Sequence, residues 1–146
     1  MEKQVFISLL YLFSLGILPS ASQSNKAKYP WDNGKLIVSD NKKYLQHENG
    51  TPFFWLGETA WLLPSRSNRD EVDFFMNEKQ KDEYNVVQVS VLHDIPAMNS
   101  YGHFALPYGF DFSNIDKPGI YNYWQHIDYI VETARQRGIY IAIVCV

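Results

Sequence analysis

Apolar runs alternate with amphipathic segments along this chain, and the alternation restricts its fold more than any other feature. Apolar runs open residues 53–61 and fill residues 86–92 and 139–146, as expected of buried strands. Between them, residues 68–84 and 121–137 carry apolar side chains at helical spacing. Strands that alternate with helices form parallel sheets with right-handed crossovers. The predicted fold class is therefore α/β.

Capping signals mark the limits of both helices. Asn68, followed by Glu71 three residues later, predicts a capping box at the start of the first helix, and Gly138 is placed to end the second. The side chains expected to face the sheet are Val72, Phe75, Met76 and Lys79 or Gln80 in the first helix, and Trp124, Ile127, Ile130, Val131 and Ala134 in the second.

A small antiparallel unit is expected before the first of these strands. Residues 36–39 and 44–47 fit short strands, and Asp40-Asn41 and Asn49-Gly50 are strong turn formers. The second turn leads directly into residues 53–61, so this hairpin unit is expected to plug or flank the base of the main fold. Asn49-Gly50-Thr51 also matches a glycosylation acceptor, but a tight turn explains it.

The N-terminus is interpreted as a targeting segment. Lys3, an apolar stretch over residues 5–18 and small residues at 19–22 predict a signal peptide over residues 1–22. The stretch is shorter than the roughly 20 residues of a membrane-spanning helix. We therefore expect export to the periplasm or beyond, no stable membrane insertion after cleavage, and a polar tether over residues 23–34.

Composition excludes several classes of function. The net charge is −3 and no basic cluster occurs, which argues against a nucleic-acid partner. No phosphate-binding loop, serine nucleophile elbow or metal-ligand spacing is present, so neither metal nor cofactor is expected. Aromatic residues make up 16% of the chain, which suits either a sugar-stacking cleft or a core of large side chains. The single cysteine, Cys145, excludes an intrachain disulfide.

Chain length bears on completeness. A closed barrel of eight strand–helix units needs roughly 200 residues or more, whereas cleavage after Ser22 leaves 146 − 22 = 124. The last apolar run, residues 139–146, has no helix after it to cover it. The sequence is therefore interpreted as the N-terminal part of a longer protein, cut after its third strand.

Three segments resemble the apiosidase-like glycoside hydrolases, family 140 of the sugar hydrolases. They are residues 51–61, residues 85–92, and residues 100–103 with the helix at 123–131. Glu58 stands where the family more often has Asp. The resemblance covers residues 35–146 and implies the N-terminal portion of a (β/α)8 TIM barrel, namely its first three strands and two helices. It also implies cleavage of glycosidic bonds in plant cell-wall polysaccharide, in the best-known members an apiose-linked side chain of pectin.

The candidate site residues follow the predicted strands. Glycoside hydrolysis needs two carboxyl groups, and the resemblance assigns both to strands beyond Val146, so the fragment alone is expected to be inactive. The side chains predicted to bind an oligosaccharide or polysaccharide are Glu58, Trp61, His93, Asp94, Asn99, Tyr101 and His103. Structural alternatives stay open for Glu58, as a strand-end carboxylate tied to backbone N–H groups or an arginine, for Trp61, as packing beneath a loop, and for His93-Asp94, as an internal loop hydrogen bond. The alternative function is a non-catalytic carbohydrate-binding or surface interaction module.

Overall fold

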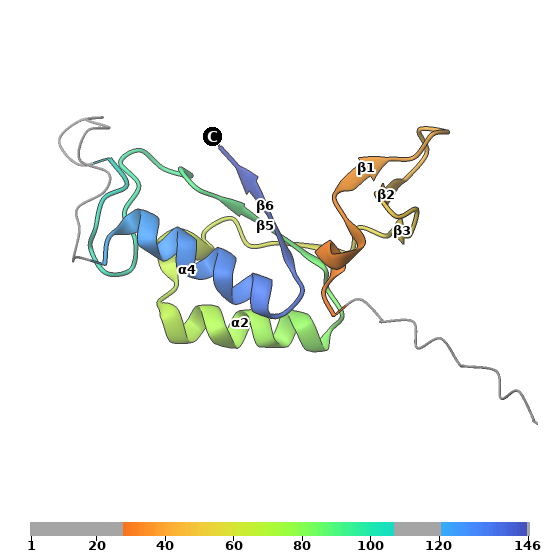
Figure 1. Ribbon diagram of the computed structural model, residues 1–146. Helices are drawn as coiled ribbons and strands as arrows, with labels where there is room; N and C mark the ends of the chain where they lie inside the picture. The colour runs from red at the N-terminus through yellow and green to blue at the C-terminus, as the bar shows by residue number, and fades with distance from the viewer. Residues whose placement is uncertain (1–27, 107–120, 146) are drawn as a thin grey trace, which may run out of the picture.

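Two three-stranded sheets and two long helices make up the computed structural model, which describes residues 28–106 and 121–145 (Figure 1). The expected signal peptide, the first part of the expected tether and the end of the loop after residue 92 lie outside these ranges. In chain order the elements are η1 Pro30–Asn33, β1 Leu36–Val38, β2 Leu45–His47, β3 Pro52–Phe53, β4 Gly57–Thr59, α1 Leu63–Arg66, α2 Arg69–Lys81, β5 Val86–Ser90, α4 Tyr123–Gln136 and β6 Tyr140–Val144.

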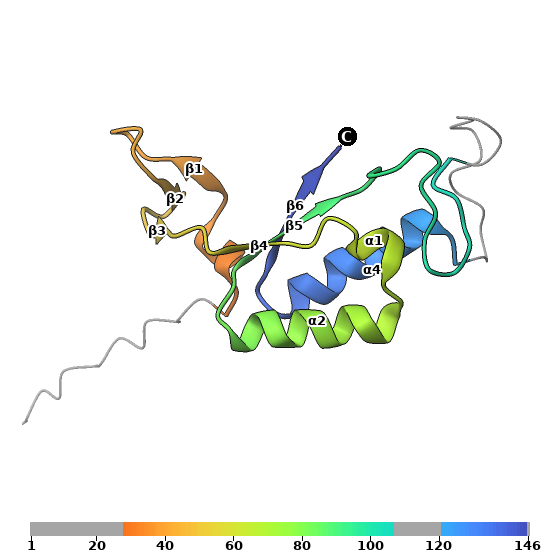
Figure 2. The ribbon, with the colours of Figure 1, turned by 180° about the vertical axis from the view of Figure 1, so that it is seen from behind.

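The main sheet is parallel, with the order β4-β5-β6, as the alternation predicted. Gly57 pairs with Val86 and Val86 with Tyr140, so the three strands start level with one another. Helices α2 and α4 lie against the same face of this sheet (Figures 1 and 2). Within residues 28–106 and 121–145 the sheet stays open. No helix in these ranges is long and apolar enough to span a membrane.

The core lies between the parallel sheet and the two helices. Val87 and Val89 of β5 point toward the helices, where they join the fully buried Val72 and Met76 of α2. Capping boxes begin both helices, with Asn68 accepting from the Glu71 amide and Asn122 from the Gln125 amide. Every second residue of β5 therefore packs against residues four apart in α2. This is the contact that the strand and helix periodicity of the sequence predicted.

Helix α4 differs in detail from its prediction. Val131 was expected to face the sheet but is 38% exposed, whereas Ile130 and Ala134 are buried. The helix begins two residues into the predicted range, and its buried side comprises Tyr123, His126, Ile127, Ile130, Thr133 and Ala134. A further short helix, α1, which no sequence pattern predicted, lies between β4 and α2.

The second sheet is antiparallel, with the order β1-β2-β3, and it flanks the N-terminal end of the parallel sheet as expected. Tyr140, the first residue of β6, makes edge contacts with Phe53 of β3 at 5.6 Å and with Trp31 at 5.7 Å between ring centroids. Trp31 belongs to η1, so the later part of the expected tether is a short helix packed on the fold. Gly50, in the predicted Asn-Gly turn, has a φ of 86°.

Residues 53–61 do not form one buried strand, and that prediction is wrong. Phe53 ends β3 of the antiparallel sheet and Gly57 begins β4 of the parallel one, while Phe54 between them is 78% exposed. The Asn85 side chain takes the place of a strand partner here. Its amide donates to the Phe54 carbonyl at 2.6 Å and its oxygen accepts from the Leu56 amide at 2.9 Å. The chain therefore crosses between sheets through a bridged link.

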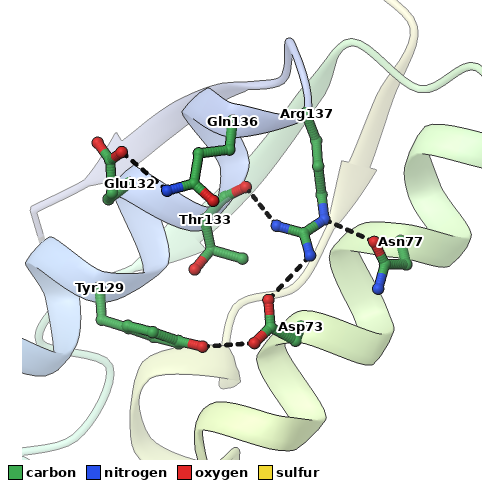
Figure 3. Close-up of polar contacts among 7 residues, drawn as sticks. All are labelled: Asp73, Asn77, Tyr129, Glu132, Thr133, Gln136 and Arg137. Atoms are coloured by element: carbon green, nitrogen blue, oxygen red, sulfur yellow. Dashed lines mark hydrogen bonds and ion pairs between the residues drawn. The ribbon is translucent and has the colours of Figure 1, made fainter.

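A polar network joins α2 to the end of α4 (Figure 3). Arg137 donates to Asp73 and Asn77 of α2 and to the Thr133 carbonyl, each at 2.8 Å. Tyr129 donates its hydroxyl to the second oxygen of Asp73 at 2.6 Å. Asp73 thus receives two donors from α4, and these bonds set how the two helices lie against each other.

Candidate functional site

Polar and aromatic side chains gather at the carboxyl end of the parallel strands. After β4 the chain stays beside β5, since the Ser90 amide donates to the Trp61 carbonyl at 3.2 Å. The Trp61 indole meets the His93 ring edge-on, with centroids 6.1 Å apart, and remains 47% exposed. Trp61 and His93 therefore form an open aromatic surface at this edge.

The segment after β5 is a tight hairpin over residues 97–105. The Ala105 amide donates to the Ala97 carbonyl at 2.8 Å, and Met98 bridges to Phe104. At the tip, the Asn99 side-chain oxygen accepts from the amides of Tyr101, at 3.1 Å, and His103, at 3.0 Å. Asn99 thus shapes the turn by replacing backbone partners, as short polar side chains do in loops.

Neighbouring helices hold this hairpin in place. Ser100 donates its hydroxyl to the Ser67 carbonyl and the Arg69 amide donates to the Tyr101 hydroxyl, both at 2.9 Å. From α4, the Trp124 indole donates to the Ala105 carbonyl at 2.8 Å and the Tyr123 hydroxyl to the Val91 carbonyl at 2.5 Å. Burial raises the pKa of Tyr123 to about 12, so its hydroxyl stays a donor at neutral pH.

Two hollows open at this edge. One, of about 450 Å³, is a wide depression beside Trp61 and α1. The other, of about 480 Å³, is more enclosed and lies between α1 and the hairpin, with His93, Asp94 and Asn99 among its lining residues. Arg66, at the end of α1, lines both. We call the second one the hairpin hollow.

The seven predicted site residues do not all meet. Trp61, His93, Asp94 and Asn99 line the two hollows. Glu58 lies on the opposite face of β4, where it accepts from Lys79 of α2 at 3.0 Å. This hydrogen bond is the main reason that the pKa of Lys79 is raised. Glu58 is thus a tied carboxylate, although its partner is a lysine and not the backbone N–H groups or arginine that were expected. Side chains alternate along β4, and Glu58 lies on the side that faces the helices.

Tyr101 and His103 belong to the hairpin but lie apart from the hollows. The Tyr101 hydroxyl caps the first turn of α2, and its ring contacts Tyr121 and His126 at 5.2 and 5.6 Å. His103 bonds through its backbone: its carbonyl accepts from the Asn99 amide and its amide donates to the Asn99 side-chain oxygen, both at 3.0 Å. Arg66 was missed by sequence reasoning, because a lone arginine after an apolar link carries no pattern that marks a site.

His126 anchors the floor beneath the hairpin and is fully buried. Its Nε2 lies 2.9 Å from the Ser67 carbonyl, which can only accept, so Nε2 carries the proton and donates. Nδ1 then accepts from the Tyr121 hydroxyl at 2.6 Å. Burial lowers the pKa of His126, and the Arg69 guanidinium, 4.0 Å above the Tyr121 ring, adds to this effect. The histidine is therefore held neutral.

Stability is expected to fall as the pH drops below 6.5. The unfolded chain protonates His126 near its ordinary pKa of 6.5, whereas the folded chain resists protonation until a lower pH. The unfolded state then binds more protons, which favours unfolding. Urea midpoints measured from pH 8 to pH 5 check this. A His126→Gln variant should lose part of the slope and a variant of the exposed His93, His93→Asn, should keep it; an equal slope in all three proteins would contradict the assignment.

Carboxylates are scarce at this edge. Of the described residues that line the two hollows, Asp94 alone carries a carboxyl group. In residues 28–106 and 121–145, no group of three or more His, Cys, Asp or Glu side chains is arranged to hold a metal ion. The described residues of this edge present an aromatic surface, hydrogen-bond donors and one carboxylate, which suit binding of a hydroxyl-rich ligand.

Comparisons with known proteins show to which family the chain is similar. The family model described as "Apiosidase-like, catalytic domain" matches residues 39–146. A solved structure of a glycoside hydrolase is 52% identical, with a TM-score of 0.78 over 82% of this chain and 27% of its own. A family 5 glycoside hydrolase from Bacteroides vulgatus ATCC 8482 is 55% identical, with a TM-score of 0.79 over 83% of this chain and 26% of its own. No curated protein matches. The chain spans about a quarter of the length of these solved structures.

Proposed function

Because this chain belongs to the apiosidase-like family of glycoside hydrolase catalytic domains, we propose that the protein hydrolyses a glycosidic bond in plant cell-wall polysaccharide of the pectin type. An apiose-linked side chain is the proposed substrate. The scaffold in this proposal is a (β/α)8 barrel in which β4, β5 and β6 are the first three strands. Export by a signal peptide over residues 1–22 is part of the same proposal.

The observation that carries the proposal is the Trp61–His93 surface at the carboxyl end of the parallel strands. In barrels of this class the active site lies at that end of the sheet. The half-exposed indole offers a flat apolar face to the C–H groups of a sugar ring, while the adjoining hollows supply polar partners for its hydroxyls. A sugar stacked on Trp61 would lie within reach of both hollows.

Catalysis requires more than this surface. Two carboxyl groups must flank the scissile bond, about 5 Å apart for retention and wider for inversion. Asp94 is the one carboxylate that the described residues bring to the hollows, since Glu58 is engaged by Lys79 on the other face. We therefore assign the catalytic pair to barrel strands other than β4, β5 and β6, and we expect residues 23–146 alone to release no sugar.

A chimera tests the proposal. Residues 39–146 would replace the matching segment of the Bacteroides vulgatus glycoside hydrolase, whose 55% identity favours correct packing. The chimera is expected to release sugar from pectic oligosaccharides that carry apiose side chains, with the unmodified relative as reference. Trp61→Ala should lower kcat/KM about tenfold through lost stacking. Phe74→Ala, an exposed aromatic on the outer side of α2, should leave it unchanged.

Two outcomes would contradict the proposal. A folded chimera that binds these oligosaccharides but never cleaves them, although the relative does, would favour the non-catalytic carbohydrate-binding module. A Trp61→Ala chimera as active as the unmodified one would remove the aromatic surface from the site. In either case circular dichroism of the chimera establishes that it is folded.

A further inference from the structure

Asn99 carries a buried donor that its structural role leaves unused. Its side chain is 2% exposed, and its oxygen accepts from two backbone amides of the hairpin. Those amides can only donate, so the orientation of the side chain is settled and the NH2 group is the other branch. Among the residues that the structure describes, this Nδ2 has no hydrogen-bond partner. Buried donors without a partner are rare in proteins and call for a ligand or water.

The hairpin hollow, which Asn99 lines, offers further groups for a ligand. Arg66 lines it as well, and within residues 28–106 and 121–145 its guanidinium has no carboxylate or ring partner, whereas Arg137 and Lys79 are paired. Asp94 adds an acceptor to the same wall. One amide donor, one guanidinium and one carboxylate match a sugar unit, whose hydroxyls both donate and accept.

The wall that holds these groups is rigid before any ligand binds. The Ser100 hydroxyl ties the hairpin tip to Ser67, and Tyr123, also a lining residue, is fixed by its bond to the Val91 carbonyl. Side chains held in this way lose little conformational freedom on binding, which favours recognition. The hollow adjoins the Trp61–His93 surface, since His93 is among its lining residues and Arg66 lines both hollows.

We propose that the hairpin hollow is a second sugar subsite next to the Trp61 ring, in which Asn99 Nδ2 and Arg66 donate to oxygens of one sugar unit and Asp94 accepts from its hydroxyls. The substrate class is then an oligosaccharide of at least two units, one on Trp61 and the next in the hollow. The inference rests on the proposed function.

Nuclear magnetic resonance on the 15N-labelled full chain tests the subsite. The probes are D-galactose and D-galacturonate, which differ only at C6. The Asn99 side-chain NH2 signals and the Trp61 indole signal report the two places separately. Asn99→Asp keeps an oxygen that can accept from the two turn amides and replaces the NH2 donor by a charged oxygen, and it should weaken binding at the hollow about tenfold. Asn77→Asp, the same change on the exposed side of α2, should have no effect.

The outcomes separate the subsite from the proposed function. Shifts of the Asn99 NH2 signals by either sugar support the subsite when the Gly102 amide, which also borders the hollow, shifts with them and does so more weakly in Asn99→Asp. A stronger response to galacturonate that Arg66→Met abolishes shows that Arg66 pairs with a carboxylate. A Trp61 response without one at Asn99 overturns the subsite and leaves the proposed function intact. No response at either residue counts against both. The Tyr101 and His103 amide signals show whether Asn99→Asp keeps the hairpin; if they move, Arg66→Met alone decides.

Discussion

Replacing Met76 by alanine is expected to lower the free energy of unfolding by about 2–5 kcal/mol. Met76 is fully buried at the centre of the layer between α2 and β5, where it packs with Val72, Val87 and Ile130. Removing its side chain takes away apolar burial and leaves a cavity that fixed neighbours cannot fill. The effect is large because strand and helix both lose contacts at the same point.

Urea denaturation of the full chain, followed by tryptophan fluorescence, measures this effect. The matched control is Phe74→Ala, which shortens a side chain two residues away that is 68% exposed. Phe74→Ala should change the free energy of unfolding by less than about 0.5 kcal/mol. Equal losses in the two variants would show that α2 does not pack on the sheet through Met76.

The second large effect is expected for Arg137→Met, at about 1–2 kcal/mol. The Arg137 side chain is 14% exposed and holds Asp73 and Asn77 of α2 together with the Thr133 carbonyl of α4 (Figure 3). Methionine keeps much of the apolar stem but removes the charge and all three hydrogen bonds. Because water can re-solvate the half-exposed Asp73, the loss should stay below that of a fully buried pair.

A double-mutant cycle with Asp73→Ala isolates the part that belongs to the Arg137–Asp73 pair. The control is Arg135→Met, two residues away on the same turn, which breaks an exposed ion pair with Glu132 within α4. Since water screens that pair, Arg135→Met should have little effect on the urea midpoint. Additive changes in the Arg137–Asp73 cycle would mean that the pair does not couple the helices.

Periodicity and capping predicted most of the elements. The Asn68–Glu71 box starts α2 where expected, Gly138 ends the α4 segment with a φ of 75°, and the valines of β5 are buried as their continuous apolar run indicated. These signals are local, so they can be interpreted without knowing which distant residues pack against each element. The prediction of a single strand over residues 53–61 was wrong because a distant residue decides the structure there. The Asn85 side chain bridges Phe54 and Leu56.

The candidate site was predicted only in part. Trp61, His93, Asp94 and Asn99 follow β4 and β5, and parallel strands bring the residues after their ends to one edge. Glu58 was assigned to the same site although strand alternation turns it toward Lys79. For Tyr101, the hydrogen bond from the Arg69 amide draws its hydroxyl to the start of α2, a contact between residues 32 positions apart.

The alternation of strands and helices, their caps, the parallel sheet and the family could all be inferred from the sequence, since each depends on short-range patterns or on motifs in order. Three features required the three-dimensional structure: the face of β4 on which Glu58 lies, the position of Arg66 between the two hollows, and the Asn99 NH2 group without a partner among the described residues. Burial and hydrogen-bond satisfaction are properties of the surroundings, and packing supplies those surroundings from residues distant in the chain.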